Sequence, residues 1–183
     1  MSEIIIVTGL PRSGTSLMMQ ILKKVPLEIK TDNLRKSDIN NPEGYYEFEA
    51  VKGISKNNQF LKDCQGKVIK IVAPLPQFID LNLKYKVIFM RRDLDEVLIS
   101  QEKMLKKDQS LERDKFKNIY ELHLKRTRQF FDLNKIPILD VEFRELMSNP
   151  EIEIEKLIQF LNLNCSNSKL IDCINPNYYR SKC

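Results

Sequence analysis

A strand-like run followed by a glycine-containing loop and a helix is the feature that most constrains the fold of this chain. The run from Ile4 to Thr8 is β-branched and almost uniformly apolar, which is typical of a strand covered on both faces. Apolar residues then recur at helical spacing between Leu17 and Val25, and Pro26 ends the pattern. A buried strand followed directly by a helix predicts an α/β fold.

Strands and helices continue to alternate along the rest of the chain. We expect strands at residues 67–73, 87–90 and 137–141, and helices at 94–105, at 111–133 and from Asn149-Pro150 onward. The polar stretch 28–44 is predicted to be a long loop, and residues 46–61 are moderately helical. This order predicts a three-layer α/β sandwich with a mainly parallel sheet.

The loop after the first strand has the spacing G-x-x-x-x-G-T-S, from Gly9 to Ser16. This is the frame of the Walker A phosphate-binding loop, with Thr15 in the place of the lysine. Inward-facing backbone N–H groups and the positive end of the helix dipole make such a loop a site for anions. Arg12, inside the loop, is the nearby cation. The alternative is that the two glycines only form a tight turn.

Length and composition argue against several classes of protein. The 183 residues fit one domain, 1–183, and a net charge of +5 is too weak to indicate nucleic-acid binding. The apolar runs fall far short of the ~20 residues that a membrane span needs. The four cysteines form no C-x-x-C pair and His123 is the one histidine, so we expect no zinc site. Scattered thiols and an N-terminus unlike a secretion signal favour a cytoplasmic location.

The segment Pro11-Arg12-Ser13-Gly14-Thr15-Ser16 is similar to the phosphosulfate-binding loop of the sulfotransferase family, which reads Pro-(Lys/Arg)-Ser-Gly-Thr-(Ser/Thr). The resemblance implies a P-loop fold like that of nucleoside-triphosphate hydrolases. It also implies 3′-phosphoadenosine 5′-phosphosulfate (PAPS) as the sulfuryl donor, adenosine 3′,5′-bisphosphate (PAP) as the product, and no metal. By this resemblance, the donor's 5′-phosphosulfate is bound by Pro11, Arg12, Ser13, Gly14, Thr15 and Ser16.

A second match to the family follows the predicted strand at 87–90. Arg92 and Ser100, eight residues apart, stand where sulfotransferases bind the 3′-phosphate of the donor. A guanidinium can donate to two phosphate oxygens at once, and a hydroxyl adds one more hydrogen bond. Without the resemblance, the same residues read as a basic residue after a strand and a serine on a solvated helix face.

A third match places Phe143 at the position of a tyrosine in the family's Tyr-Glu-Asp-Leu segment. Its ring could flank the nucleotide, and the alternative is a phenylalanine packed in the core. Together the matches extend from residue 4 to about residue 163, and the tail beyond is weakly matched. Arg180 and Lys182 in that tail are poor substitutes for the family's Arg-Lys-Gly segment.

Sulfuryl transfer needs positive charge at the bridging oxygen and a base for the acceptor's proton. Arg12 and the loop N–H groups meet the first need. Residues 41–47 resemble the Asn-Pro-x-Gly-Tyr-Trp-Glu segment of bacterial-type sulfotransferases, which makes Glu47 the first candidate for the base, before Glu43 and Glu49. A glutamate is also expected near a helix N-terminus for its charge alone.

Lys70 ends a predicted strand, where the family often has a lysine that meets the transferring group. The Asp-Pro-Arg that follows this lysine in bacterial relatives is absent here. Two other functions stay open: a P-loop small-molecule kinase that uses ATP and magnesium, and a non-catalytic nucleotide-binding protein of the same fold. The sequence identifies neither the acceptor, a small molecule or a glycan, nor the oligomeric state.

Overall fold

The computed structural model describes residues 2–38, 41–175 and 179. In these residues a five-stranded sheet has the order β2-β3-β1-β4-β5, and every neighbouring pair of strands is parallel. The strands are β1 (Ile4–Gly9), β2 (Glu28–Lys30), β3 (Lys67–Lys70), β4 (Tyr85–Arg91) and β5 (Ile138–Glu142). The predicted α/β fold with a parallel sheet is confirmed.

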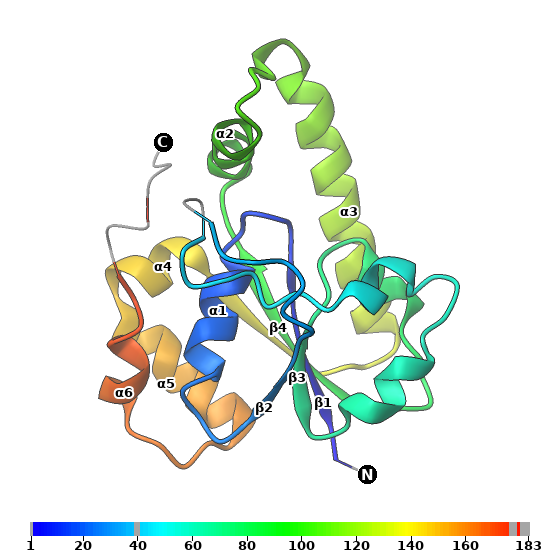
Figure 1. Cartoon of the computed structure of the whole chain (residues 1–183), viewed down its shortest axis with the longest axis vertical. Helices are drawn as coiled ribbons and strands as arrows, with labels where there is room; N and C mark the ends of the chain where they lie inside the picture. The colour runs from blue at the N-terminus through cyan, green and yellow to red at the C-terminus, as the bar shows by residue number, and fades with distance from the viewer. Residues whose placement is uncertain (1, 39–40, 176–178, 180–183) are drawn as a thin grey trace.

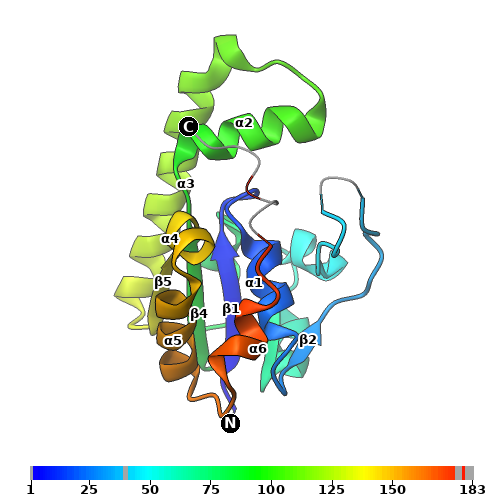
Figure 2. The same cartoon turned by 90° about the vertical axis from the view of Figure 1, so that its left-hand side faces the viewer.

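Helices and short 3-10 turns cover both faces of the sheet (Figure 1). One face carries α1, α4, α5 and α6, and the other carries α3 and the turns η1, η2 and η3 (Figures 1 and 2). The α-helices are α1 (Thr15–Leu22), α2 (Leu94–Leu105), α3 (Arg113–Leu133), α4 (Phe143–Ser148), α5 (Pro150–Leu161) and α6 (Asn167–Ile171). The 3-10 turns are η1 (Glu49–Gly53), η2 (Gln59–Cys64), η3 (Leu75–Phe78) and η4 (Ser110–Glu112).

Two buried clusters on opposite faces of the sheet explain why β1 is apolar from Ile4 to Val7. Ile5 and Val7 pack in one cluster with side chains of α1 and α5. Ile4 and Ile6 pack in the other cluster with Phe131 of α3. Because successive side chains of a strand point to opposite faces, a strand covered on both faces needs apolar residues at every position. β1 is the central strand and is buried along its whole length.

Several segments differ from the sequence prediction. Glu28–Lys30, predicted to lie in a loop, forms the edge strand β2, which pairs with β3. The helix predicted at 46–61 is instead two short 3-10 turns, η1 and η2. The strand predicted at 67–73 is shorter, because β3 ends at Lys70. Ile71 and Ala73 still donate backbone hydrogen bonds to β1, which is adjacent to β3 in the sheet. No helix was predicted where α6 lies.

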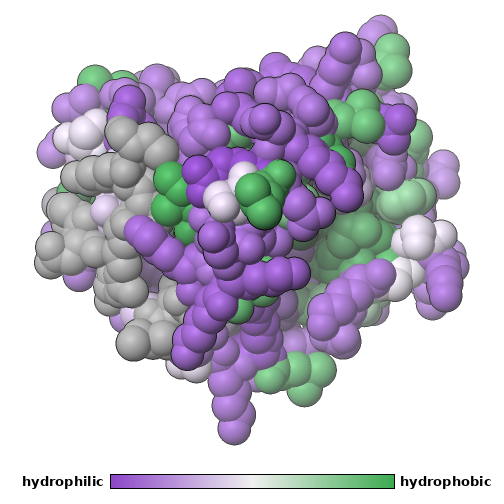
Figure 3. Space-filling model, turned by 90° about the horizontal axis from the view of Figure 1, so that it is seen from above, coloured by the Kyte–Doolittle hydropathy of each residue, from purple (hydrophilic) through white to green (hydrophobic). Residues whose placement is uncertain are grey.

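The carboxyl ends of β1, β3 and β4 meet at the same end of the molecule, and α1 and α2 begin there (Figures 1 and 2). Seen from above, this end presents a largely hydrophilic surface (Figure 3). Ligands of open α/β sheets bind at the carboxyl ends of the strands, so this end is where a site is expected. Within the described residues, no helix has both the length and the apolar character that crossing a membrane requires.

Candidate active site

The loop between β1 and α1 is a tight turn closed by contacts within itself. The backbone N–H of Ser13 donates to the Leu10 carbonyl at 3.2 Å, and its hydroxyl donates to the same oxygen at 2.8 Å. Gly14 takes a left-handed conformation with φ +97° and stands immediately before α1. A Cβ at Gly14 would lie 2.5 Å from Cδ2 of Phe143, so only glycine lets this ring approach the loop.

A cavity of about 380 Å³ lies at this end of the sheet and brings together most of the residues predicted from the sequence. The predicted site residues that line it are Pro11, Arg12, Gly14, Thr15, Ser16, Glu47, Lys70, Arg92, Ser100 and Phe143. Ser13 instead lines a smaller cavity of about 260 Å³ together with Leu10. Its side chain is 2% exposed and is directed back into the loop.

Arg12 connects the loop to α2. Its Nε donates to the hydroxyl of Ser100 at 3.0 Å, and its Nη1 lies 3.8 Å from the sulfur of Met104. Its backbone carbonyl accepts a hydrogen bond of 2.9 Å from Nη1 of Arg92. Burial lowers the pKa of Arg12, with a smaller contribution from the nearby charge of Arg92. The residues predicted for the two phosphate sites of the donor therefore touch one another.

Arg92 follows β4 and is held where α2 begins. Asp93 caps this helix, since its carboxylate accepts from the backbone N–H groups of Asp95 and Glu96. The Arg92 side chain is 7% exposed and pairs with Glu96 at 2.9 Å. Its guanidinium carbon lies 4.4 Å from the centre of the Phe143 ring. Phe143 is buried and also forms part of the cavity wall. It therefore packs in the core, as one interpretation of the sequence predicts, and stands where its ring could flank a nucleotide, as the other predicts.

Lys70 stands at the end of β3 and faces the start of α1. Its ammonium lies 3.5 Å from the hydroxyl of Ser16 and 3.6 Å from a carboxylate oxygen of Glu47, and it donates to the carbonyl of Tyr45. Burial lowers the pKa of Lys70 to about 8, and the neighbouring charge of Glu47 opposes that shift. An amine with this pKa is mostly protonated at neutral pH and loses its charge in mildly basic solution.

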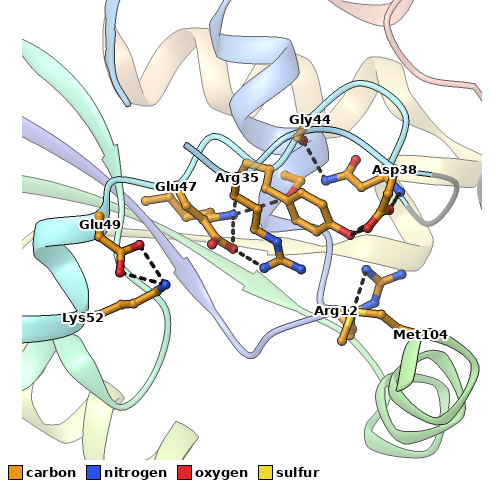
Figure 4. A network of polar contacts seen from close by, with 12 residues as sticks. Arg12, Arg35, Asp38, Gly44, Glu47, Glu49, Lys52 and Met104 are labelled. Atoms are coloured by element: carbon orange, nitrogen blue, oxygen red, sulfur yellow. Dashed lines mark hydrogen bonds and ion pairs between the residues drawn. The ribbon is translucent and has the colours of Figure 1, made fainter. Parts of the chain in front are cut away.

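Glu47 lies across the cavity from the loop, on the segment that covers the site (Figure 4). Its carboxylate accepts from Arg35 at 2.8 Å. Arg35 is stacked 3.5 Å above the ring of Tyr45, whose hydroxyl donates to Asp38. Glu47 precedes η1 rather than lying in a helix, so the location predicted for it was wrong although it lines the cavity.

The other two candidate bases, Glu43 and Glu49, and the one histidine lie elsewhere. Glu49 pairs with Lys52 at 2.7 Å at the start of η1 (Figure 4). Glu43 is exposed and does not line the cavity. His123 lies on α3 beside the ring of Tyr120, and burial lowers its pKa. Neither Glu49 nor His123 lines the cavity, which leaves Glu47 as the candidate base that does.

Some cavity residues were not singled out from the sequence. Arg35, Tyr45 and Lys103 line the cavity, and Glu96 binds Arg92 behind its wall. Tyr45 belongs to the segment that resembles bacterial-type sulfotransferases, and Glu96 follows Arg92 at the i, i+4 spacing typical of helical ion pairs. The motif could have pointed to Tyr45, and the spacing could have pointed to Glu96.

The segment that contains Arg180 and Lys182 lies outside the described residues. Within the part of the chain that the structure describes, no three His, Cys, Asp or Glu side chains come together in a way that could hold a metal ion.

Comparison with known proteins shows which proteins share this fold. Solved structures with the same fold include the mouse sulfotransferase SULT7A1 complexed with PAP (TM-score 0.58, 14% identity, 97% of this chain and 63% of that chain). They also include sulfotransferase STF1 from Mycobacterium tuberculosis H37Rv (TM-score 0.55, 13% identity, 95% and 71%). A third is retinol dehydratase in complex with androsterone and inactive cofactor PAP (TM-score 0.55, 13% identity, 96% and 64%).

At these identities the likeness establishes the fold, and this chain spans only 63% of the length of the mouse protein. No curated protein sequence matches the chain. The family model for the sulfotransferase domain matches residues 2–181, which is nearly the whole chain. The resemblance noted in the loop and after β4 is therefore confirmed at the level of the family, and the chain belongs to the sulfotransferase domain family.

Proposed function

We propose that this protein is a sulfotransferase that moves a sulfuryl group from PAPS to a hydroxyl or amine of an acceptor. The observation that carries the proposal is the contact between the two predicted anion-binding groups in one cavity. Arg92 donates from Nη1 to the Arg12 carbonyl at 2.9 Å, and Arg12 donates to Ser100 at 3.0 Å. Membership of the family and neighbours of the same fold crystallised with PAP support the same reading.

The residues of the cavity fit a doubly anionic nucleotide. Thr15 and Ser16 stand at the start of α1, where the helix dipole adds positive potential for the 5′-phosphosulfate, and Arg12 lies in the loop before it. Arg92 and Ser100 both hydrogen-bond to Arg12 and line the same cavity, where they can bind the 3′-phosphate. When bound, the donor supplies the activated sulfuryl group. The acceptor supplies the nucleophile, and the protein supplies binding, charge stabilisation and the base.

Lys70 and Glu47 are assigned the roles of stabilising charge and accepting a proton. Lys70 reaches the hydroxyl of Ser16 at the start of α1, so its ammonium can neutralise charge on the oxygen that leaves the sulfur. Glu47 lies 3.6 Å from Lys70, and Arg35 orients its carboxylate from the other side. A carboxylate held there can take the proton of an acceptor that approaches in line with the loop.

Titration of the purified protein with PAP and with ATP and magnesium tests the donor class, and incubation with PAPS and a panel of hydroxyl and amine acceptors tests the reaction. We expect tight PAP binding and transfer of labelled sulfate to at least one acceptor. A preference for ATP and magnesium would instead support the kinase reading. PAP binding without transfer to any acceptor would support the non-catalytic reading.

Four sequence predictions stay predictions beside this proposal. They are the small-molecule or glycan acceptor, the single domain over 1–183, the cytoplasmic location and the absence of a metal. The acceptor is expected to contact the segment 31–48, because Arg35, Tyr45 and Glu47 all present side chains to the cavity.

A further inference from the structure

The buried carboxylate of Glu96 contacts Arg92, the residue predicted to bind the 3′-phosphate of the donor. Glu96 is 2% exposed, and one carboxylate oxygen accepts from Nε of Arg92 at 2.9 Å. The other oxygen accepts from the hydroxyl of Tyr179 at 2.5 Å. The rings of Phe143 and Tyr179 pack edge to face, with centroids 5.2 Å apart, and both lie beside the Arg92 guanidinium.

These contacts fix the orientation of the Arg92 side chain. Nε donates to Glu96, Nη1 donates to the Arg12 carbonyl at 2.9 Å, and the Phe143 ring lies 4.4 Å from the guanidinium carbon. Two hydrogen bonds made from different nitrogens of one planar group define its plane and its rotation about the side chain. A long side chain held in this way loses little further conformational freedom when it binds a ligand.

Glu96 is negatively charged, so it cannot itself attract the phosphate groups of the donor. Arg92 and Glu96 together carry no net charge, so the pair offers a phosphate fixed N–H donors rather than an excess of positive charge. Burying a carboxylate is unfavourable unless hydrogen bonds and an opposite charge compensate it. A geometric role accounts for a buried carboxylate that faces an arginine on one side and a hydroxyl on the other.

We propose that Glu96 is a positioning residue, which holds Arg92 in the orientation that binds the 3′-phosphate of the donor. The inference rests on the proposed function, and it names the residue that makes the site selective for a 3′-phosphorylated nucleotide. Glu96 touches neither donor nor acceptor in this scheme and acts through Arg92.

The test compares affinities for PAP and for adenosine 5′-monophosphate, which lacks the 3′-phosphate, by calorimetry. Glu96→Gln keeps an oxygen that can accept from Arg92 and removes the charge, so we expect the preference for PAP to stay or to rise. Glu96→Leu removes the acceptor, so we expect the preference to fall about tenfold or more, the size of a lost hydrogen bond to a charged group. Affinity for the monophosphate should change little.

Glu102 provides the matched control, since it lies on the same helix and pairs with Arg113 at 2.9 Å away from the cavity lining. Glu102→Leu should leave the preference unchanged. Tyr179→Phe removes the hydroxyl that donates to the second oxygen of Glu96 and that also contacts Arg144, and we expect the preference to fall about two- to tenfold. This variant decides the question if Glu96→Leu does not fold, as judged by thermal unfolding.

Two results would overturn the positioning role while leaving the proposed function intact. One is a full preference for PAP in folded Glu96→Leu, or in Tyr179→Phe where Glu96→Leu does not fold. The other is a loss of the preference for PAP in Glu96→Gln as large as in Glu96→Leu. That result would mean that the charge of Glu96, and not the orientation of Arg92, determines the preference. A wild-type protein that binds both nucleotides equally would overturn the proposed function, and this inference with it.

Discussion

Replacement of Gly14 by alanine tests the close approach of the loop to Phe143. Gly14 has φ +97°, and a Cβ there would lie 2.5 Å from Cδ2 of the ring. A left-handed backbone costs an alanine about 1–2 kcal/mol, and a methyl group forced into a packed contact costs about 1–3 kcal/mol. We therefore expect Gly14→Ala to lower the free energy of unfolding by about 2–5 kcal/mol.

Two other glycines separate these contributions. Gly44 has φ +95°, but the nearest atom to a Cβ there, in the Tyr46 ring, is 4.0 Å away, so Gly44→Ala should cost only the backbone strain of about 1–2 kcal/mol. Gly53 has no positive φ and no atom within 4 Å, so Gly53→Ala should be neutral or stabilising by about 0.4–1 kcal/mol. Urea unfolding followed by circular dichroism measures all three.

The comparison between Gly14→Ala and Gly44→Ala is decisive. Equal losses would show that the ring of Phe143 does not press on the loop, and the packing described here would be wrong. If the contact is real, Phe143→Leu should recover part of the loss when combined with Gly14→Ala, because the two sites are in contact and their effects are not additive. PAP affinity should fall in Gly14→Ala and not in Gly44→Ala, since the displaced ring also packs against Arg92.

The other predictions concern the assigned site residues. Arg92→Leu should weaken PAP binding about tenfold to hundredfold, with little change for adenosine 5′-monophosphate, and equal affinities in calorimetry for wild type and variant would contradict the 3′-phosphate assignment. Glu47→Gln should slow sulfuryl transfer about 10²–10⁴-fold with unchanged PAP affinity, and a fully active variant in the transfer assay would show that another group is the base. Wild-type PAP affinity should fall as the pH rises through about 8, where Lys70 loses its charge, and this fall should be absent in Lys70→Met. The folded-state pKa of Lys70 lies below the unfolded value of 10.5, so the unfolded chain binds more protons between these values. The stability of the wild type relative to Lys70→Met should therefore increase from pH 8 to 10.5, as urea unfolding across that range can check.

The central part of the fold could be predicted because its sequence signals are local. Ile4 to Val7 are apolar at every position, as a strand covered on both faces requires, and the glycines that follow fix the turn into α1. The strand Glu28–Lys30 could not be predicted, because three residues with one apolar side chain show no periodicity. η1 and η2 resemble a helix in composition, but they are 3-10 segments of five and six residues that bury few side chains.

In the site, too, local sequence motifs predicted some residues, whereas contacts between residues far apart in the sequence could not be predicted. Arg12, Arg92 and Ser100 follow from motif spacing, and the cavity contains all three. The hydrogen bond between Arg92 and the Arg12 carbonyl joins residues 80 positions apart, and no local pattern encodes it. Arg35 likewise reaches Glu47 only because the covering segment folds back on itself. Their assigned roles stay predictions until the variants above are measured.

The alternation of β1 between the two clusters has a consequence for which insertions and deletions this chain can tolerate. Removing a single residue between Ile4 and Val7 would move the side chains on one side of the deletion to the opposite face of the sheet, out of the cluster in which they now pack. Removing two would restore the parity of the strand while shortening it. Length changes should therefore be rare within β1 and should accumulate in exposed segments away from the cavity, such as residues 106–112.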